Sequence, residues 1–192
     1  MAGLIPQPSL GHLSPLVGAR KIEATHQGLP RDVIRGRATF SWLGEGLFLI
    51  WSARYDHPDI PDSIAIMGCD DAGDLRDPEG GCTVQYDDVR GVTRRYRLSA
   101  EPGIWRYWRD VPGLSQRFTG RISDDGSAIG GIVELNRDGS TWEADLVITY
   151  RRLGWKAQQR APRDLAIDGP SSATGPGEAA LDRTNTDRCD SE

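Results

Sequence analysis

The sequence predicts an all-β fold, an antiparallel up-and-down meander of about nine to ten strands closed into a barrel, with a short N-terminal helix. Apolar and polar residues alternate from Arg35 to Arg151, which is the period of half-buried strands. Gly, Pro, Asp and Asn interrupt this alternation about every 8–12 residues, as in barrels and sandwiches. The short connections favour sequential hairpins, and closing such a meander removes its exposed edges. A two-layer sandwich is the alternative.

The alternation places strands at 35–42, 47–54, 63–69, 82–86, 92–99, 104–109, 114–122, 128–135 and 141–151. Period two then assigns side chains to faces. Arg94 shares the inward face with Tyr96, and Gln116 shares one with Phe118. On the strand at 104–109 we assign Arg106 and Trp108 to the interior. On the last strand, Trp142 is expected on the same face as Ile148 and Tyr150.

Three segments are expected along the chain. Residues 1–17 form a lead-in and a short helix over about 10–17, which Ser9 caps and which presents Leu10, Leu13, Leu16 and Val17 on one face. Residues 18–154 form the barrel domain. Residues 155–192 are rich in Gly, Pro, Ser, Thr and charged side chains, and this composition is typical of a disordered tail.

Charge and cysteine content exclude several classes of protein. The net charge is −5, so we expect neither a nucleic-acid nor a membrane partner. No segment resembles a signal peptide, which indicates a cytoplasmic protein. The three cysteines are odd in number, so a disulfide framework is not expected, and Cys69 and Cys82 are interpreted as small buried thiols.

A binding site is predicted inside the barrel. The expected ligand is small, partly apolar and anionic, because aromatic side chains alternate with arginines on inward positions. The predicted ligand-binding residues are Trp42, Tyr86, Arg94, Tyr96, Arg106, Trp108 and Phe118. The alternative is that the aromatic side chains fill the core and that the arginines pair with acids such as Asp88 or Asp145.

Catalysis has little support in the pattern. Triads, paired metal-binding histidines and phosphate-binding glycine loops are absent, so neither a metal nor a cofactor is expected. The one candidate base is His57, between Asp56 and Pro58. Local hydrogen bonding within its proline-rich loop is the alternative role.

Five segments resemble a set of uncharacterised bacterial domains whose fold is similar to the calycin barrels of lipocalins and fatty-acid-binding proteins. They are GRATFSWL, HPDIPDSIAI, YDDVRGV, WRYWRD and SQRFTG, at 36–43, 57–66, 86–92, 105–110 and 115–120. The resemblance implies a barrel that binds a small ligand. Many such barrels begin with Gly-x-Trp, whereas this chain has Gly18-Ala19-Arg20, an arginine that can stack over the barrel mouth. The haem-binding relatives need a late histidine, and none follows His57.

Three functions are consistent with these observations. The leading hypothesis is a binding module for an unidentified small molecule. The second is a packed structural or assembly barrel, in which the doubly apolar strands at 47–51 and 64–67 would form a homodimer through an outer face. The third is an enzyme acting on a small molecule, with His57 or Asp88 as the base.

Overall fold

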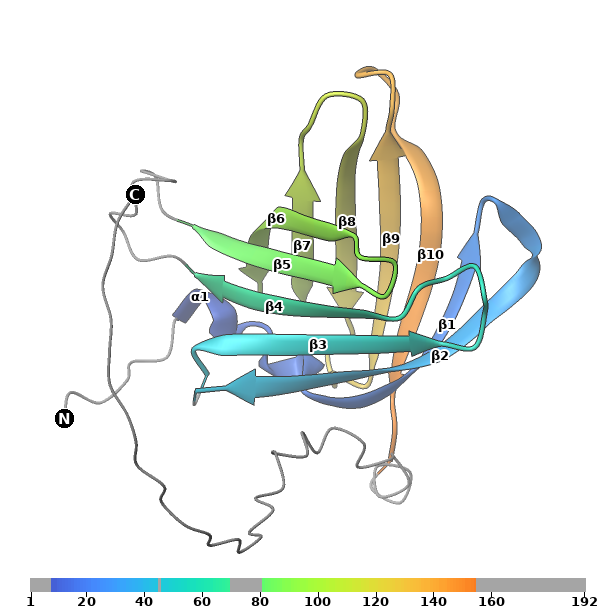
Figure 1. Ribbon diagram of the computed structural model, residues 1–192. Helices are drawn as coiled ribbons and strands as arrows, with labels where there is room; N and C mark the ends of the chain where they lie inside the picture. The colour runs from blue at the N-terminus through green and yellow to red at the C-terminus, as the bar shows by residue number, and fades with distance from the viewer. Residues whose placement is uncertain (1–7, 45, 70–80, 155–192) are drawn as a thin grey trace, which may run out of the picture. The chain divides into compact units, whose positions relative to one another are not determined.

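The described part of the chain forms a closed antiparallel barrel of ten strands (Figure 1). The computed structural model describes residues 8–44, 46–69 and 81–154. The strands are β1 (Gly18–His26), β2 (Leu29–Leu43), β3 (Phe48–Tyr55), β4 (Ser63–Cys69), β5 (Cys82–Asp88), β6 (Thr93–Glu101), β7 (Ile104–Arg109), β8 (Ser115–Ile122), β9 (Ala128–Asn136) and β10 (Glu143–Arg152). Each strand pairs with the next along the chain, and β1 also pairs with β10. The predicted meander is therefore confirmed over the sandwich.

Closure depends on a strand that the alternation pattern did not reveal. β1 lies between β2 and β10, and Ile22 stands opposite Gly36 on one side and Tyr150 on the other. Its inward face carries Arg20, Ile22 and Ala24, all buried. With a single bulky apolar residue on that face, β1 has too weak a hydrophobic period to be recognised.

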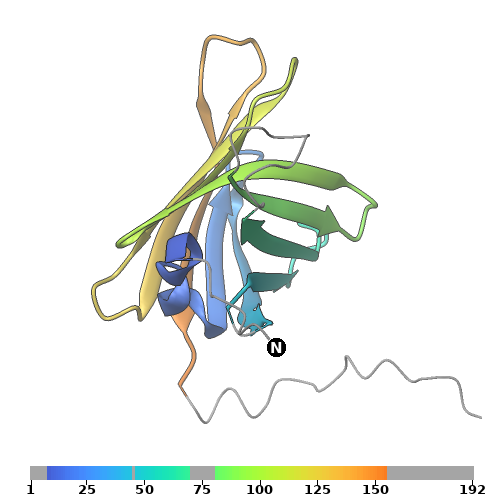
Figure 2. The ribbon, with the colours of Figure 1, turned by 90° about the vertical axis from the view of Figure 1, so that its left-hand side faces the viewer.

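Short helices close one end of the barrel. The predicted single helix over 10–17 is wrong: the chain forms α1 (Pro8–Gly11) and a 3-10 turn, η1 (Ser14–Leu16), so position 9 falls within the bounds of α1 and not before its start. Leu10, Leu13 and Leu16 are buried in the core, so the predicted apolar face is confirmed for these three. Figure 2 shows the short helical segment against the barrel strands. Within the described ranges, no helix is long and apolar enough to span a membrane.

Aromatic side chains fill the middle of the barrel. The fully buried Trp105 contacts Phe40, Trp51 and Phe118, with ring centroids 5.8, 6.4 and 4.8 Å away. Phe118 lies so close to Gly131 that a Cβ there would be 2.4 Å from its ring. Glycine on β9 thus makes room for a ring from β8, and the interior is packed rather than hollow at this level.

The face assignment on β7 is wrong. Trp105 points inward, whereas Arg106 pairs with Glu101 on the exterior (2.9 Å). The strand has aromatic residues on both faces, so its composition did not distinguish the inward face from the outward face.

The predicted face of Trp142 is also wrong. The β9–β10 register shifts between Ala144 and Leu146, and the Trp142 ring lies 4.2 Å from the guanidinium carbon of Arg117.

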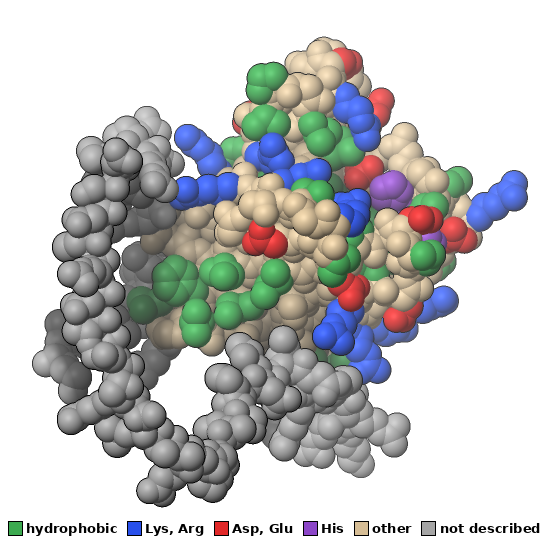
Figure 3. Space-filling model, viewed as in Figure 1, with side chains coloured by type: hydrophobic (Ala, Val, Ile, Leu, Met, Phe, Trp, Pro, Cys, Tyr) green, Lys and Arg blue, Asp and Glu red, His purple; other side chains and the backbone are tan. Residues whose placement is uncertain are grey.

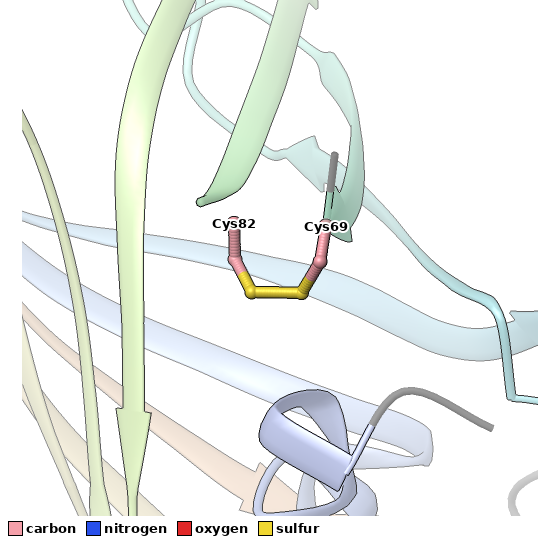
Figure 4. The surroundings of a disulfide bond; sticks show 2 residues. All are labelled: Cys69 and Cys82. Carbon is pink, nitrogen blue, oxygen red and sulfur yellow. A yellow bond between two sulfur atoms is a disulfide. The ribbon is translucent and has the colours of Figure 1, made fainter. Parts of the chain in front are cut away.

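Cys69 and Cys82 form a disulfide between β4 and β5 (Figure 4). The two residues stand directly opposite each other in the register. The interpretation as free buried thiols is therefore wrong. Counting cysteines missed the bond, because the pairing depends on the alignment of two strands that are separated by residues 70–81.

The chain divides into residues 1–160 and 161–192. The predicted disordered tail at 155–192 lies outside the described residues.

Candidate functional site

A pocket opens at the barrel end opposite the short helices. Its volume is about 230 Å³. The walls come from the strand ends and loops at this end, and the lining residues are His26, Trp51, Tyr55, Asp59, Ile60, Pro61, Ser63, Tyr86, Arg90, Arg94, Tyr96, Tyr107, Gln116, Arg117, Val133, Asp145 and Leu146. Concave sites with apolar walls and a few polar groups are the usual form of small-molecule sites.

The pocket floor continues the aromatic core. Trp51 extends from the packed layer to Tyr86 (ring centroids 6.4 Å apart), and Tyr86 meets Tyr96 at 6.5 Å. Tyr96 in turn contacts Tyr107 edge to face at 5.2 Å. The Trp51 Nε1–H group is buried and has no hydrogen-bond partner among the described residues. The aromatic wall thus offers flat apolar surface to the pocket.

Arg94 is the central charge of the pocket. Its Nη1 donates to Gln116 Oε1 (2.9 Å), and the Tyr96 hydroxyl donates to the same oxygen (3.0 Å). The prediction that Arg94 faces inward is confirmed, but pairing with Asp88 or Asp145 is not observed. Among the described residues no carboxylate forms an ion pair with this half-buried guanidinium. Within the described residues, the hydrogen bond of the Arg94 guanidinium therefore goes to a neutral amide oxygen.

Two acids near the pocket mouth contact partners of their own. Asp145 Oδ1 lies 3.3 Å from His26 Nε2, and Asp88 Oδ2 lies 2.7 Å from Arg90 Nη2. The Arg90 hydrogen bond holds the pKa of Asp88 at about 2, so this carboxylate stays ionised and paired. Asp59 is exposed at the rim, where water screens it.

Three tyrosines of this end, Tyr55, Tyr86 and Tyr107, stay protonated. Burial raises the pKa of Tyr86 to about 12 and raises those of Tyr55 and Tyr107 further above the ordinary value. Their hydroxyls are therefore neutral donors, and the Tyr86 hydroxyl donates to Asp88 Oδ2 (3.2 Å).

The predicted site residues are divided among three places. Tyr86, Arg94 and Tyr96 line the pocket, whereas Phe118 and Trp42 belong to the core and its margin. The prediction that Arg106 and Trp108 lie in the interior is wrong, because both point outward from β7. Trp51, Tyr107 and Gln116 line the pocket but were not predicted as ligand-binding residues. The inward face of β8, on which Gln116 precedes Phe118, was the available signal for Gln116.

His57 lies outside the pocket lining. Its Nδ1 accepts the Asp59 backbone N–H (3.2 Å), and its Nε2 lies 3.5 Å from Asp32 Oδ2. Because both ring nitrogens have local partners, this histidine stabilises its loop, and the pocket has no contact with the candidate base. The second candidate base, Asp88, is occupied by Arg90 and Tyr86.

Comparisons with known proteins identify the fold. No protein-family model matches the chain, and no curated protein matches it. Among solved structures, the crystal structure of Rv2717c from M. tuberculosis is similar, with a TM-score of 0.53 and 14% identity. The match covers 78% of this chain and all of that one. At this identity the likeness shows a shared barrel and carries no statement about ligands.

Proposed function

We propose that the protein is a non-catalytic, calycin-like binding module that holds a small, partly apolar molecule in the pocket at the open end. The observation that carries this proposal is the pairing of an aromatic wall, Trp51 to Tyr107, with the Arg94–Gln116 pair in one concave site. Apolar walls supply binding energy, and a few polar groups orient the ligand.

The packed middle of the barrel supports a small ligand over a large one. Trp105 and Phe118 occupy the space below the pocket, so a long acyl chain would have to displace buried rings.

The Cys69–Cys82 disulfide is relevant to the cellular compartment of the protein. The sequence led us to expect a cytoplasmic protein, and this location remains a proposal. The disulfide is an argument against it, because disulfides persist in oxidising compartments.

Filling the pocket is expected to abolish binding. Ser63 lines the pocket, and Ser63→Phe would place a ring in it. We expect tryptophan fluorescence to change saturably with at least one of phenol, indole, benzamide and benzoate, and the affinity to fall by roughly tenfold or more in Ser63→Phe. Ser41→Phe adds the same ring on an exposed position of β2 and should leave binding unchanged. If no compound of the panel binds the unmodified protein, the proposal is wrong.

An exposed apolar surface favours assembly as a second candidate function. Leu43, Phe48, Ile64 and Ile66, on β2 to β4, are 41–52% exposed, and hydrophobic side chains gather over these strands in Figure 3. We propose that a second copy of the chain covers this surface. Arg37 and Arg54 lie across β2–β3 from each other, and Asp87 lies on the β5 margin. A two-fold axis along the strands would bring the arginines of one copy toward Asp87 of the other.

A charge placed in this surface is expected to dissociate the dimer. We expect sedimentation to give a dimer for the unmodified protein and a monomer for Ile66→Glu, because a carboxylate cannot be buried unpaired against the same surface. Val147→Glu is the matched control, since Val147 is also an exposed apolar residue (51%, against 42% for Ile66) but lies on β10. A monomer at every concentration of the unmodified protein would exclude this interface.

A further inference from the structure

We propose that the ligand class of the pocket is a single-ring aromatic monocarboxylate, whose carboxylate binds Arg94 and whose ring lies against the tyrosine wall. This inference rests on the proposed binding function and specifies it.

The first argument is charge. Arg94 contacts the neutral Gln116 Oε1, while the neighbouring carboxylates of Asp88 and Asp145 are held by Arg90 and His26. A half-buried cation with no anion is costly, and the planar fork of a guanidinium matches a carboxylate with two parallel hydrogen bonds. Arg94 offers a single guanidinium to a ligand, which favours a monocarboxylate over a doubly charged phosphate.

The second argument is the polarity of the hydrogen-bonding groups. Arg94 donates, and the Tyr107 hydroxyl that lines the pocket is kept protonated by its burial. Donor groups at the pocket match a ligand with oxygen acceptors.

The third argument is size and shape. A dry cavity of about 150 Å³ accepts benzene. A pocket of about 230 Å³ therefore has room for one ring with a carboxylate, but not for a fused-ring macrocycle or a long chain. Tyr96 and Tyr107 meet edge to face, so they offer aromatic faces and edges to a flat ring.

Matched probes separate these arguments. Calorimetry of the full chain would compare benzoate with benzamide, which has the same ring without the charge, and with cyclohexanecarboxylate, which has the charge without the flat ring. We expect benzoate to bind about tenfold or more tightly than either. Inorganic phosphate should not compete with benzoate.

Arg94 variants test the assigned contact. Arg94→Met should remove the preference for benzoate over benzamide, and Arg94→Lys should restore only part of it, because an ammonium lacks the planar fork. Arg106→Met is the control, since Arg106 pairs with Glu101 on the outside and should not affect binding. Thermal unfolding of each variant would show whether it folds, and the comparison of probes on the unmodified protein needs no variant.

The outcomes distinguish the two proposals. If benzamide or phenol binds as tightly as benzoate and Ser63→Phe abolishes that binding, the carboxylate class is wrong and the binding function stands. If benzoate is preferred but Arg94→Met keeps the preference, the assigned contact is wrong. If none of the probes binds, the binding function itself is wrong.

Discussion

Trp105→Ala is expected to lower the free energy of unfolding by about 4 kcal/mol, at the upper end of the range for buried aromatic residues. Trp105 is fully buried, and its indole contacts Phe40, Trp51 and Phe118 from three other strands. Removing it leaves a cavity that the surrounding rings cannot fill, because each strand of a closed barrel is hydrogen-bonded on both sides and cannot shift inward by itself. Urea unfolding followed by circular dichroism would measure the change.

Trp108→Ala is the matched control for this prediction. Trp108 has the same side chain on the same strand but points outward and is half-exposed. Its loss should cost much less than that of Trp105. Equal costs for the two variants would contradict the placement of the core on the Trp105 face. Trp105→Phe should fall between them, since it keeps a ring and removes the unpartnered indole N–H.

Arg20→Met is expected to lower the free energy of unfolding by about 3 kcal/mol. The Arg20 side chain is fully buried at the closed end, where Nε donates to the Leu16 carbonyl (3.0 Å) and Nη2 to those of Gly126 (3.0 Å) and Pro15. Methionine has similar length but removes the side-chain donor to the Leu16 carbonyl, and it leaves the carbonyls of Pro15 and Gly126 to Arg152 Nη2 alone (2.8 and 3.4 Å). Burial and the nearby Arg152 charge lower the pKa of Arg20 to about 10, and it remains protonated at neutral pH.

Lys21→Met is the control for the closed end. Lys21 is exposed and pairs only with Glu23, so its loss should cost under about 1 kcal/mol. Thermal or urea unfolding would compare the two variants. If Arg20→Met costs no more than Lys21→Met, then Arg20 does not hold η1 to the turn between β8 and β9.

The sequence predicted the barrel well where one face of a strand is apolar and the other polar. On β6, Tyr96 and Leu98 alternate with Arg95 and Arg97, and the inward position of Arg94 followed correctly. The pattern was not informative on β7, where Trp105 and Trp108 occupy opposite faces. It was misleading on β10, because a shift in register is invisible to a fixed period of two.

The candidate site was predicted only in part for the same reason. Tyr86, Arg94 and Tyr96 line the pocket as expected, yet the partner of Arg94 is Gln116, which is 22 residues away on β8. The sequence also left open whether the interior is hollow. Side-chain volumes decide that point, since Trp105 and Phe118 fill the middle and the pocket lies at the end opposite the short helices.

By itself, the sequence determined the fold class, the order of nine of the ten strands and the apolar face of the N-terminal segment, because these depend on local periodicity and turn residues. The tertiary structure alone decided the closing role of β1, the Cys69–Cys82 disulfide, the inward face of β7 and the isolation of the Arg94 charge. Each of these depends on which residues of distant strands stand opposite each other. That alignment is set by the closed sheet as a whole, so no single stretch of sequence encodes it.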